Sequence, residues 1–160
     1  MKELTISTTF KIYEQLSELP SAVFSLMESA INARNTAYAP YSKFNVGAAI
    51  LLDNGKIVIG SNQENAAYPS GLCAERVAIF QAGALYPDAK INTIAITATS
   101  QKHKVMAPIP PCGACRQSMA EYESRQGQGI ELYFMGEEGA IMKSESLADI
   151  LPLMFEKSHL

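Results

Sequence analysis

The three cysteines of this 160-residue chain constrain its fold more than any other feature, because together they outline a metal site. Cys73 stands 39 residues (112 − 73) before Cys112, and Cys115 follows within a Pro-Cys-Gly-Ala-Cys run. Zn²⁺ favours four tetrahedral ligands, and catalytic sites leave one position to water. Three thiolates therefore predict an open zinc site and a fold that brings two distant segments together.

Glu75 supplies the acid or base that such a site needs. A metal-bound water has its pKa lowered to about 7 and must lose its proton to a neighbouring group. Glu75 lies two residues after Cys73, so a helix opening there would place its carboxylate within a turn of the metal without ligating it. We expect both cysteine groups at helix N-termini, where backbone amides and the helix dipole stabilise thiolates.

Other interpretations of these residues stay open. Cys112 and Cys115 could be a redox pair, with Cys73 an inert buried thiol. His103 could complete a structural Cys₃His site, although Glu75 would then have no role. Three thiolates, a hydroxide and a divalent ion sum to −2 (−3 −1 +2), so a positive charge is expected beside them. Arg76 is the candidate, and the alternative is a solvated arginine in an exposed first turn.

Composition limits the partners and the compartment. The net charge is only −3 and the 13 basic residues are scattered, which argues against nucleic-acid binding and favours a small, weakly charged substrate. No stretch approaches the ~20 apolar residues of a membrane span, and the first residues do not resemble a signal peptide. An odd number of cysteines in metal-like spacing indicates a reducing compartment, so we expect a cytoplasmic protein without membrane contact.

The pattern of apolar residues predicts an α/β fold, a three-layer α/β/α sandwich with a mixed five-stranded sheet. Residues 1–20 are expected to be an N-terminal extension of unknown role with a weak strand pattern, and residues 21–160 a single catalytic domain. The expected elements are a helix from residue 21 to before Pro40, a hairpin over 44–60 with a type I′ turn at Asn54-Gly55, a helix over 73–85, a strand over 93–99, a helix from Cys112, strands over 130–135 and 140–143, and a short helix after Ser146. The helix over 73–85 is apolar all round and is therefore expected to be buried on all sides.

Longer motifs resemble a known family. Cys73-Ala74-Glu75-Arg76 with Pro111-Cys112-Gly113-Ala114-Cys115-Arg116-Gln117 is similar to cytidine deaminases of the small homotetrameric type, whose fold the chain should share. Tyr38–Phe44, Val46–Ala49 and Asn62–Tyr68 follow in the family's order, so the resemblance covers roughly residues 30–155. Zinc deaminases use cysteine ligands with a glutamate that is not a ligand as general acid and base.

The resemblance implies an activity. It is the zinc-dependent hydrolysis of cytidine and 2′-deoxycytidine to uridine and 2′-deoxyuridine with release of ammonia, a step of pyrimidine salvage, with one zinc ion per chain. Glu75 would carry a proton from the attacking water to ring N3 and then to the departing amine.

The same resemblance implies roles for individual residues. By composition alone, Asn62-Gln63-Glu64 is an ordinary polar loop, but the matching residues bind the sugar 3′-hydroxyl. Phe44 matches a residue that stacks on the pyrimidine, although a phenylalanine is more often part of the core. Ala74 would offer its carbonyl to the exocyclic amine, and Arg76 would donate hydrogen bonds to the zinc thiolates.

The resemblance also implies a homotetramer with composite active sites. Tyr68 and Phe155 match residues that reach a neighbouring subunit's site. Phe155 is the weaker match, because Leu153-Met154 precede it where the family often has Gly-Ala. The all-apolar helix, with more apolar surface than one sheet face can cover, independently predicts an oligomer.

Three other functions compete with this one. Blasticidin-type deaminases share both cysteine motifs but lack the Asn-X-Glu pair, so Asn62 and Glu64 discriminate against them. Nucleic-acid editing enzymes usually carry His-X-Glu and a basic surface, in contrast to Cys73 and a net charge of −3. A non-enzymatic zinc-stabilised binding module would need a fourth protein ligand and would leave Glu75 without a role.

Overall fold

A computed structural model of the chain describes residues 1–160 and contains one mixed sheet of six strands. The strand order is β1-β6-β5-β4-β2-β3, and only β4 and β5 run parallel. The strands are β1 (Lys11–Tyr13), β2 (Phe44–Leu52), β3 (Ile57–Ser61), β4 (Ile91–Ser100), β5 (Glu131–Met135) and β6 (Ile141–Ser144).

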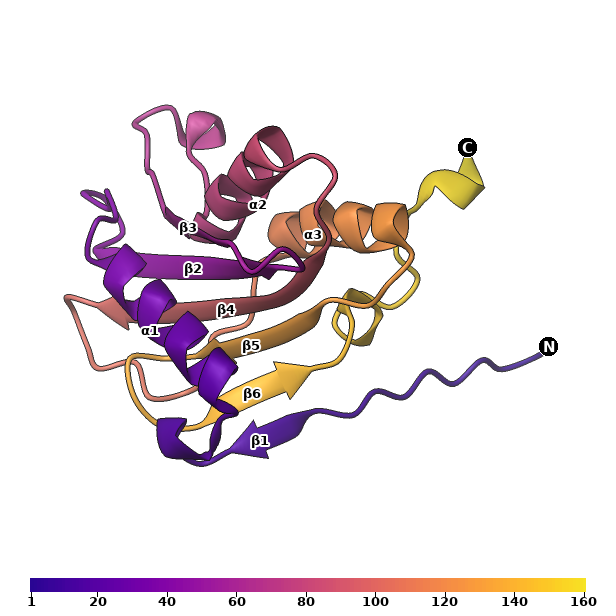
Figure 1. The fold of residues 1–160 in the computed structure, drawn as a ribbon, viewed down its shortest axis with the longest axis horizontal. Helices are drawn as coiled ribbons and strands as arrows, with labels where there is room; N and C mark the ends of the chain where they lie inside the picture. The colour runs from indigo at the N-terminus through magenta and orange to yellow at the C-terminus, as the bar shows by residue number, and fades with distance from the viewer.

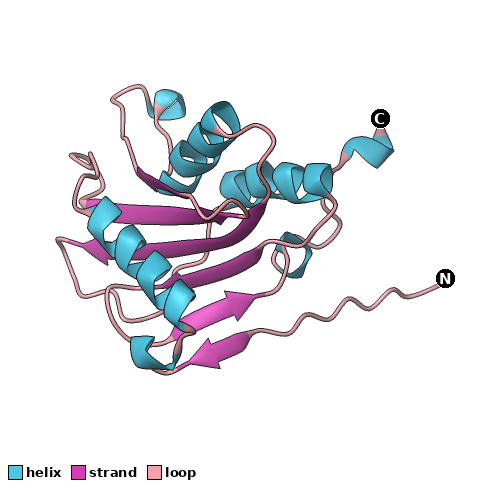
Figure 2. Ribbon diagram, in the orientation of Figure 1, coloured by secondary structure: helices cyan, strands magenta, loops and turns pink.

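Helices cover both faces of this sheet, as Figures 1 and 2 show. Helix α1 (Ser21–Arg34) lies on one face, and α2 (Ala74–Leu85) and α3 (Gly113–Gln126) lie on the other. Each interface has its own apolar cluster, one including Leu26 of α1 and the other including Ile79 of α2 and Met119 of α3. The predicted three-layer α/β/α architecture is confirmed.

Two glycines let helices approach the sheet closely. A Cβ at Gly47 of β2 would lie 2.0 Å from the carbonyl oxygen of Ala30 in α1. A Cβ at Gly60 of β3 would lie 2.5 Å from the carbonyl oxygen of Ala74 in α2. Because these neighbours are backbone atoms, only glycine permits the observed packing at either position.

The sixth strand was not expected and comes from the N-terminal extension. β1 pairs antiparallel with β6, with Lys11 opposite Lys143. The Lys143 side chain is only 8% exposed, and its ammonium group donates to Glu131 at 2.6 Å and contacts Glu145 at 2.8 Å. Lys11 reaches the same Glu145 at 2.7 Å. The weak alternating pattern therefore marks a short edge strand, which ion pairs help to hold.

Three local predictions need correction. The hairpin turn is not type I′, because Gly55 has a positive φ (78°) and Asn54 does not. The Gly55 amide donates to the Leu52 carbonyl, which fits a three-residue loop closed by a left-handed glycine. The expectation that the apolar helix is buried on all sides is wrong for one chain, because Phe80 is 45% exposed and Leu85 is 60% exposed. The short helix after Ser146 is a single 3₁₀ turn, Leu147–Asp149.

None of the helices has the length and apolar character that crossing a membrane would demand.

Candidate metal centre and substrate pocket

The three cysteines converge at the N-termini of α2 and α3. Cys73 is the N-cap of α2, Cys112 is the N-cap of α3, and Cys115 lies in the first turn of α3. The Sγ atoms of Cys73 and Cys112 are 3.8 Å apart, and those of Cys112 and Cys115 are 3.5 Å apart. All three Sγ atoms lie within 4.8 Å of one another.

These distances fit a zinc ion. Two thiolates 2.3 Å from a tetrahedral ion lie about 3.8 Å apart, whereas a disulfide joins sulfurs at about 2 Å. The metal-ligating group contains the three cysteines and no histidine, so His103, an exposed loop residue, does not complete a Cys₃His site. The chain therefore offers three ligands, and the fourth position stays open.

Hydrogen bonding within the cluster creates a thiolate. The bond from Cys115, followed by those from Arg76 and Cys112, lowers the pKa of Cys73 to about 5 although burial opposes the shift. The Cys115 thiol donates to that thiolate and is buried, so its own pKa is raised. The guanidinium Nη2 of Arg76 lies 4.0 Å from the Cys73 sulfur. Cys73 is thus charged at neutral pH and ready to bind a cation.

Glu75 lies in the first turn of α2 and is only 5% exposed. Burial raises the pKa of its carboxyl group, and the negative charge of Cys73 adds to that effect. A buried carboxyl group with a raised pKa, close to metal ligands, has the properties of a general acid and base. Glu75 thus lies in the first turn of α2 after Cys73, the location that the sequence predicted for it.

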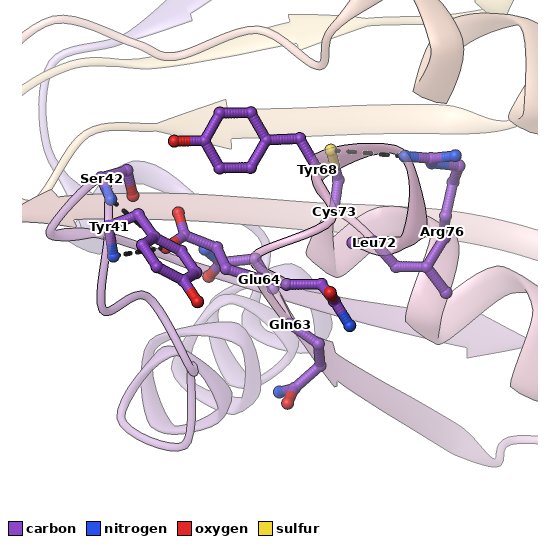
Figure 3. Close-up of a pocket in the computed structure, with 11 residues that line it drawn as sticks. Tyr41, Ser42, Gln63, Glu64, Tyr68, Leu72, Cys73 and Arg76 are labelled. Carbon is purple, nitrogen blue, oxygen red and sulfur yellow. Dashed lines mark hydrogen bonds between the residues drawn. The ribbon is translucent and has the colours of Figure 1, made fainter.

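One end of the metal centre opens into a pocket of about 500 Å³. Figure 3 shows that its walls come from the loop before β2, the segment after β3 and the start of α2. The lining residues are Tyr41, Ser42, Asn62, Gln63, Glu64, Asn65, Tyr68, Gly71, Leu72, Cys73 and Arg76. A metal ligand therefore shares a cavity with the polar residues that follow β3.

Asn62 and Glu64 both fix the pocket wall. The Asn62 side chain accepts from the Val46 amide at 2.8 Å and donates to the Phe44 carbonyl at 2.9 Å. Oε2 of Glu64 accepts from the amides of Tyr41 (2.9 Å) and Ser42 (3.2 Å), drawn as dashed lines in Figure 3. Desolvation raises the pKa of Glu64, but bonds from Ser42 and Tyr41 outweigh it and the net shift is downward. Glu64 is therefore ionised at neutral pH.

The structure brings together only part of the predicted site. Asn62, Glu64, Tyr68, Cys73 and Arg76 line the cavity. Phe44, Ala74, Glu75, Cys112, Cys115 and Phe155 are not among its lining residues. Figure 1 shows the C-terminal segment at the far end of the α2–α3 side, away from the loop between β3 and α2. Phe155 therefore does not reach the pocket of its own chain.

Sequence reasoning gave no role to several lining residues, among them Tyr41, Ser42 and Leu72. Tyr41 and Ser42 belong to the Tyr38–Phe44 motif that contributed to the family resemblance, so the signal was available. The rings of Tyr41 and Tyr68 lie with their centroids 6.0 Å apart, and Tyr68 is 75% exposed. The two tyrosines form one aromatic wall of the cavity.

Known proteins share this fold and these motifs. The family described as "Cytidine and deoxycytidylate deaminase zinc-binding region" matches residues 21–127. The cytidine deaminase of Sporosarcina psychrophila is 38% identical over 140 residues, covering 86% of this chain and 94% of its own length. That of Halalkalibacterium halodurans is 47% identical over 96 residues, covering 60% of this chain and 68% of its own. The crystal structure of the cytidine deaminase from Burkholderia pseudomallei superposes with a TM-score of 0.70 at 39% identity, covering 82% and 97% of the two chains.

The chain belongs to the cytidine and deoxycytidylate deaminase family. It is therefore an enzyme, a hydrolase that acts on C–N bonds, and its three cysteines hold one zinc ion per chain. Membership of this family disfavours the redox pair and the non-enzymatic binding module.

Proposed function

We propose that this enzyme hydrolyses cytidine and 2′-deoxycytidine to the corresponding uridines, releasing ammonia, and serves pyrimidine salvage. One observation carries the proposal: Cys73, a zinc ligand, lines the same cavity as Asn62 and Glu64. A nucleoside held by its sugar at those two residues would direct its base towards the metal centre. The cavity volume of about 500 Å³ is in the range of small-molecule sites.

Glu75 moves the protons in this proposal. Bound zinc supplies a water molecule whose pKa is lowered towards neutrality. The Glu75 carboxylate accepts a proton from the attacking water, delivers it to ring N3 and later protonates the departing amine. Its burial supports this role, since the raised pKa brings the carboxyl group closer to neutral pH. The carbonyl of Ala74 accepts from the exocyclic amine and so orients the base.

The sugar contacts use hydrogen-bonding capacity that the fold leaves free. Both backbone amides bind Oε2 of Glu64, so its other oxygen, Oε1, can accept from a ribose hydroxyl. The Asn62 amide makes one bond through each polar atom, so its second N–H can donate to the 3′-oxygen. Because Asn62 also holds the Phe44 carbonyl, the residue assigned to the sugar fixes the residue assigned to stack on the base.

Subunits of a homotetramer complete the sites. Apolar or aromatic side chains stay exposed in the single chain at Tyr68, Phe80, Leu85 and Phe155, which favours association. Phe155 would reach a neighbouring subunit's site, and Arg76 would balance the thiolate charge. Tyr68, which the resemblance also assigned to a neighbour's site, lines the pocket of its own chain instead. We further propose that residues 1–20, whose strand β1 adds an edge to the sheet, are an N-terminal extension of the catalytic domain of residues 21–160, and that the enzyme works in the cytoplasm.

A direct assay tests this function. Purified protein is incubated with cytidine, 2′-deoxycytidine or blasticidin S, and the absorbance change on deamination is followed. We expect both pyrimidine nucleosides to be substrates and blasticidin S to be left unchanged. The Glu75→Gln variant is the matched control for contaminating deaminases. No turnover of either nucleoside by zinc-loaded protein would refute the proposal, and turnover of blasticidin S alone would favour the rival.

A further inference from the structure

The C-terminal segment is fastened to α3 along its length by side chains of that helix. The Glu123 carboxylate accepts from the Ser146 hydroxyl at 2.6 Å and from the Leu147 amide at 3.0 Å. One Arg116 nitrogen, Nη1, donates to the Ile150 carbonyl at 2.8 Å. The same guanidinium donates through Nε to the Pro111 carbonyl, directly before the Cys112 ligand. The helix that carries two metal ligands therefore also carries the anchors of the chain end.

Beyond Ile150 the backbone makes a strained reversal. Leu153 has φ of +58°, a left-handed conformation that is unfavourable for a residue with a Cβ. Its side chain is 83% exposed, so burial of that side chain does not hold the turn. Met154 packs against the main apolar cluster, and the Phe155 ring projects outward with 60% of its surface exposed.

One hydrogen bond fixes the peptide that follows this reversal. Nε2 of Gln117 donates to the Phe155 carbonyl at 2.8 Å. Gln117 lies one residue after Arg116 in α3, one turn from the N-cap Cys112. The Phe155 ring stacks on His159 near the end of the chain, at a centroid distance of 5.6 Å. The direction in which the Phe155 side chain projects from the surface thus depends on Gln117 and on the backbone conformation of Leu153.

We propose that Gln117 is a positioning residue that presents the Phe155 side chain to the substrate pocket of a neighbouring subunit. This inference rests on the proposed function, in which Phe155 completes that pocket. Gln117 ties the orientation of the aromatic ring to the same rigid helix that holds Cys112 and Cys115. Each subunit would therefore supply the Phe155 ring to its neighbour's pocket. The orientation of that ring would be determined by α3 of the subunit that supplies it, the helix that also carries Cys112 and Cys115.

The test compares Gln117→Met, which keeps the length of the side chain but has no donor, with Gln117→Lys, which restores one. Losing one hydrogen bond should raise KM for cytidine about fivefold in Gln117→Met, with kcat and zinc content near wild type, and Gln117→Lys should recover most of the loss. Ser124→Ala is the matched control, because Ser124 contacts the same segment beyond Phe155, at Glu156 (3.4 Å). It should leave KM unchanged.

A double-mutant cycle separates positioning from a general structural role. If Gln117 acts through Phe155, then Gln117→Met should raise KM no further in a Phe155→Ala background. An equal effect in both backgrounds would overturn the proposal. Leu153→Val provides a second route, because a β-branched residue disfavours the left-handed backbone of the same reversal and leaves α3 unaltered. It should raise KM only when Phe155 is present, and this variant decides the matter if Gln117→Met does not fold.

Hydrogen–deuterium exchange gives a readout that does not require activity. Gln117→Met should speed exchange in residues 153–160 and leave the start of α3 protected. If wild-type protein fails to turn over cytidine while this local effect is seen, the proposed function fails and the anchoring of the segment stands. Unchanged exchange in residues 153–160 would refute the role of Gln117 regardless of activity.

Discussion

The carbonyl oxygen of Ala74 lies 2.5 Å from the position that a Cβ on Gly60 would occupy. The first turn of α2 therefore rests directly on β3, close to the end from which the chain continues to Asn62. This contact explains why a metal ligand and the sugar-binding candidates share one cavity. Because Gly60 has no side chain, α2 can approach β3 closely, and this approach determines the distance between the metal ligand Cys73 and the polar residues after β3.

Replacing Gly60 with alanine should therefore damage both stability and the metal centre. The new methyl group meets backbone atoms of Ala74 and Ala78, which cannot rotate away. We expect a loss near the upper end of the ~1–3 kcal/mol typical of overpacking, together with weaker zinc binding. Denaturant unfolding and metal analysis check this. Gly113→Ala is the control for stability, because nothing lies within 4 Å of its Cβ position. Equal stability of the two variants would contradict the packing argument.

Glu75→Gln should give a folded, zinc-loaded and nearly inactive enzyme. The amide keeps the shape of the side chain but cannot accept the proton, so turnover should fall by at least the ~10²–10⁴ that general acid–base catalysis contributes. Steady-state kinetics with parallel metal analysis measure both quantities. Loss of zinc would instead make Glu75 a ligand, and near-normal turnover would remove its role altogether.

Glu64→Ala should reduce the selectivity of the enzyme for nucleosides that carry a 3′-hydroxyl group. A site that hydrogen-bonds a hydroxyl rejects the analogue without it, so wild-type enzyme should prefer cytidine over 3′-deoxycytidine, and the variant should discriminate much less. The ratio of kcat/KM for the two nucleosides is the measurement. Because Oε2 also holds the amides of Tyr41 and Ser42, Glu64→Ala should in addition lower thermal stability. Unchanged selectivity would place the sugar contact elsewhere.

Mixed oligomers should reveal shared sites. Glu75→Gln and Phe155→Ala subunits are each impaired, but a hybrid site can combine an intact Glu75 from one subunit with an intact Phe155 from another. Activity of the mixture should exceed that of either parent once subunits exchange. Light scattering establishes the assembly and a tagged subunit proves the exchange. A monomer at assay concentration, or exchange without recovery, would exclude the composite site.

The ion pairs that hold β1 should make stability depend on pH in the acid range. Hydrogen bonds from Lys11, then from Lys143, lower the pKa of Glu145 to about 2. A carboxyl group with a depressed folded-state pKa stabilises the fold fully above its unfolded pKa, about 4.3, and the contribution is lost as the pH falls towards 2. The unfolding free energy of Glu145→Gln should therefore fall below wild type at pH 7, and the difference should shrink between pH 4 and pH 2.

The effect of Glu145 should be modest, because its side chain is 49% exposed and such pairs contribute at most about 1 kcal/mol. Glu138→Gln is the matched control, since Glu138 pairs with Lys104 at the surface, away from β1. A difference from wild type that persists unchanged at pH 2 would show that Glu145 acts through something other than its charge.

The sequence predicted the core of the site because its chemistry is local. Cys73, Glu75, Cys112 and Cys115 lie in short motifs at helix starts, and the regular spacing of apolar residues marked the strands that position them. The failures concern features without local signals. The three-residue strand β1 gains its stability from pairing with β6, and the weak alternating pattern around it does not reveal that partner. The exposure of Phe80 and Leu85 depends on which neighbouring elements pack against α2, and the apolar pattern of the helix does not contain that information.

Leu153 shows how the sequence and the structure inform each other. In the sequence, Leu153 weakens the match at Phe155, because the family often has glycine at that position. The structure gives Leu153 the left-handed backbone that glycine adopts without strain. The substitution therefore changes the side chain and preserves the turn, which supports the alignment of Phe155.

The placement of Cys73 and Cys112 as the N-caps of two different helices has a thermodynamic consequence. Ligation of both to one ion closes a loop of 39 residues (112 − 73), and by analogy with a disulfide such a cross-link removes about 4 kcal/mol of chain entropy from the unfolded state. Ligand binding to the native state stabilises it by mass action. The melting temperature of this enzyme should therefore rise with the concentration of free zinc. Beyond its role in catalysis, the bound ion would cross-link α2 and α3.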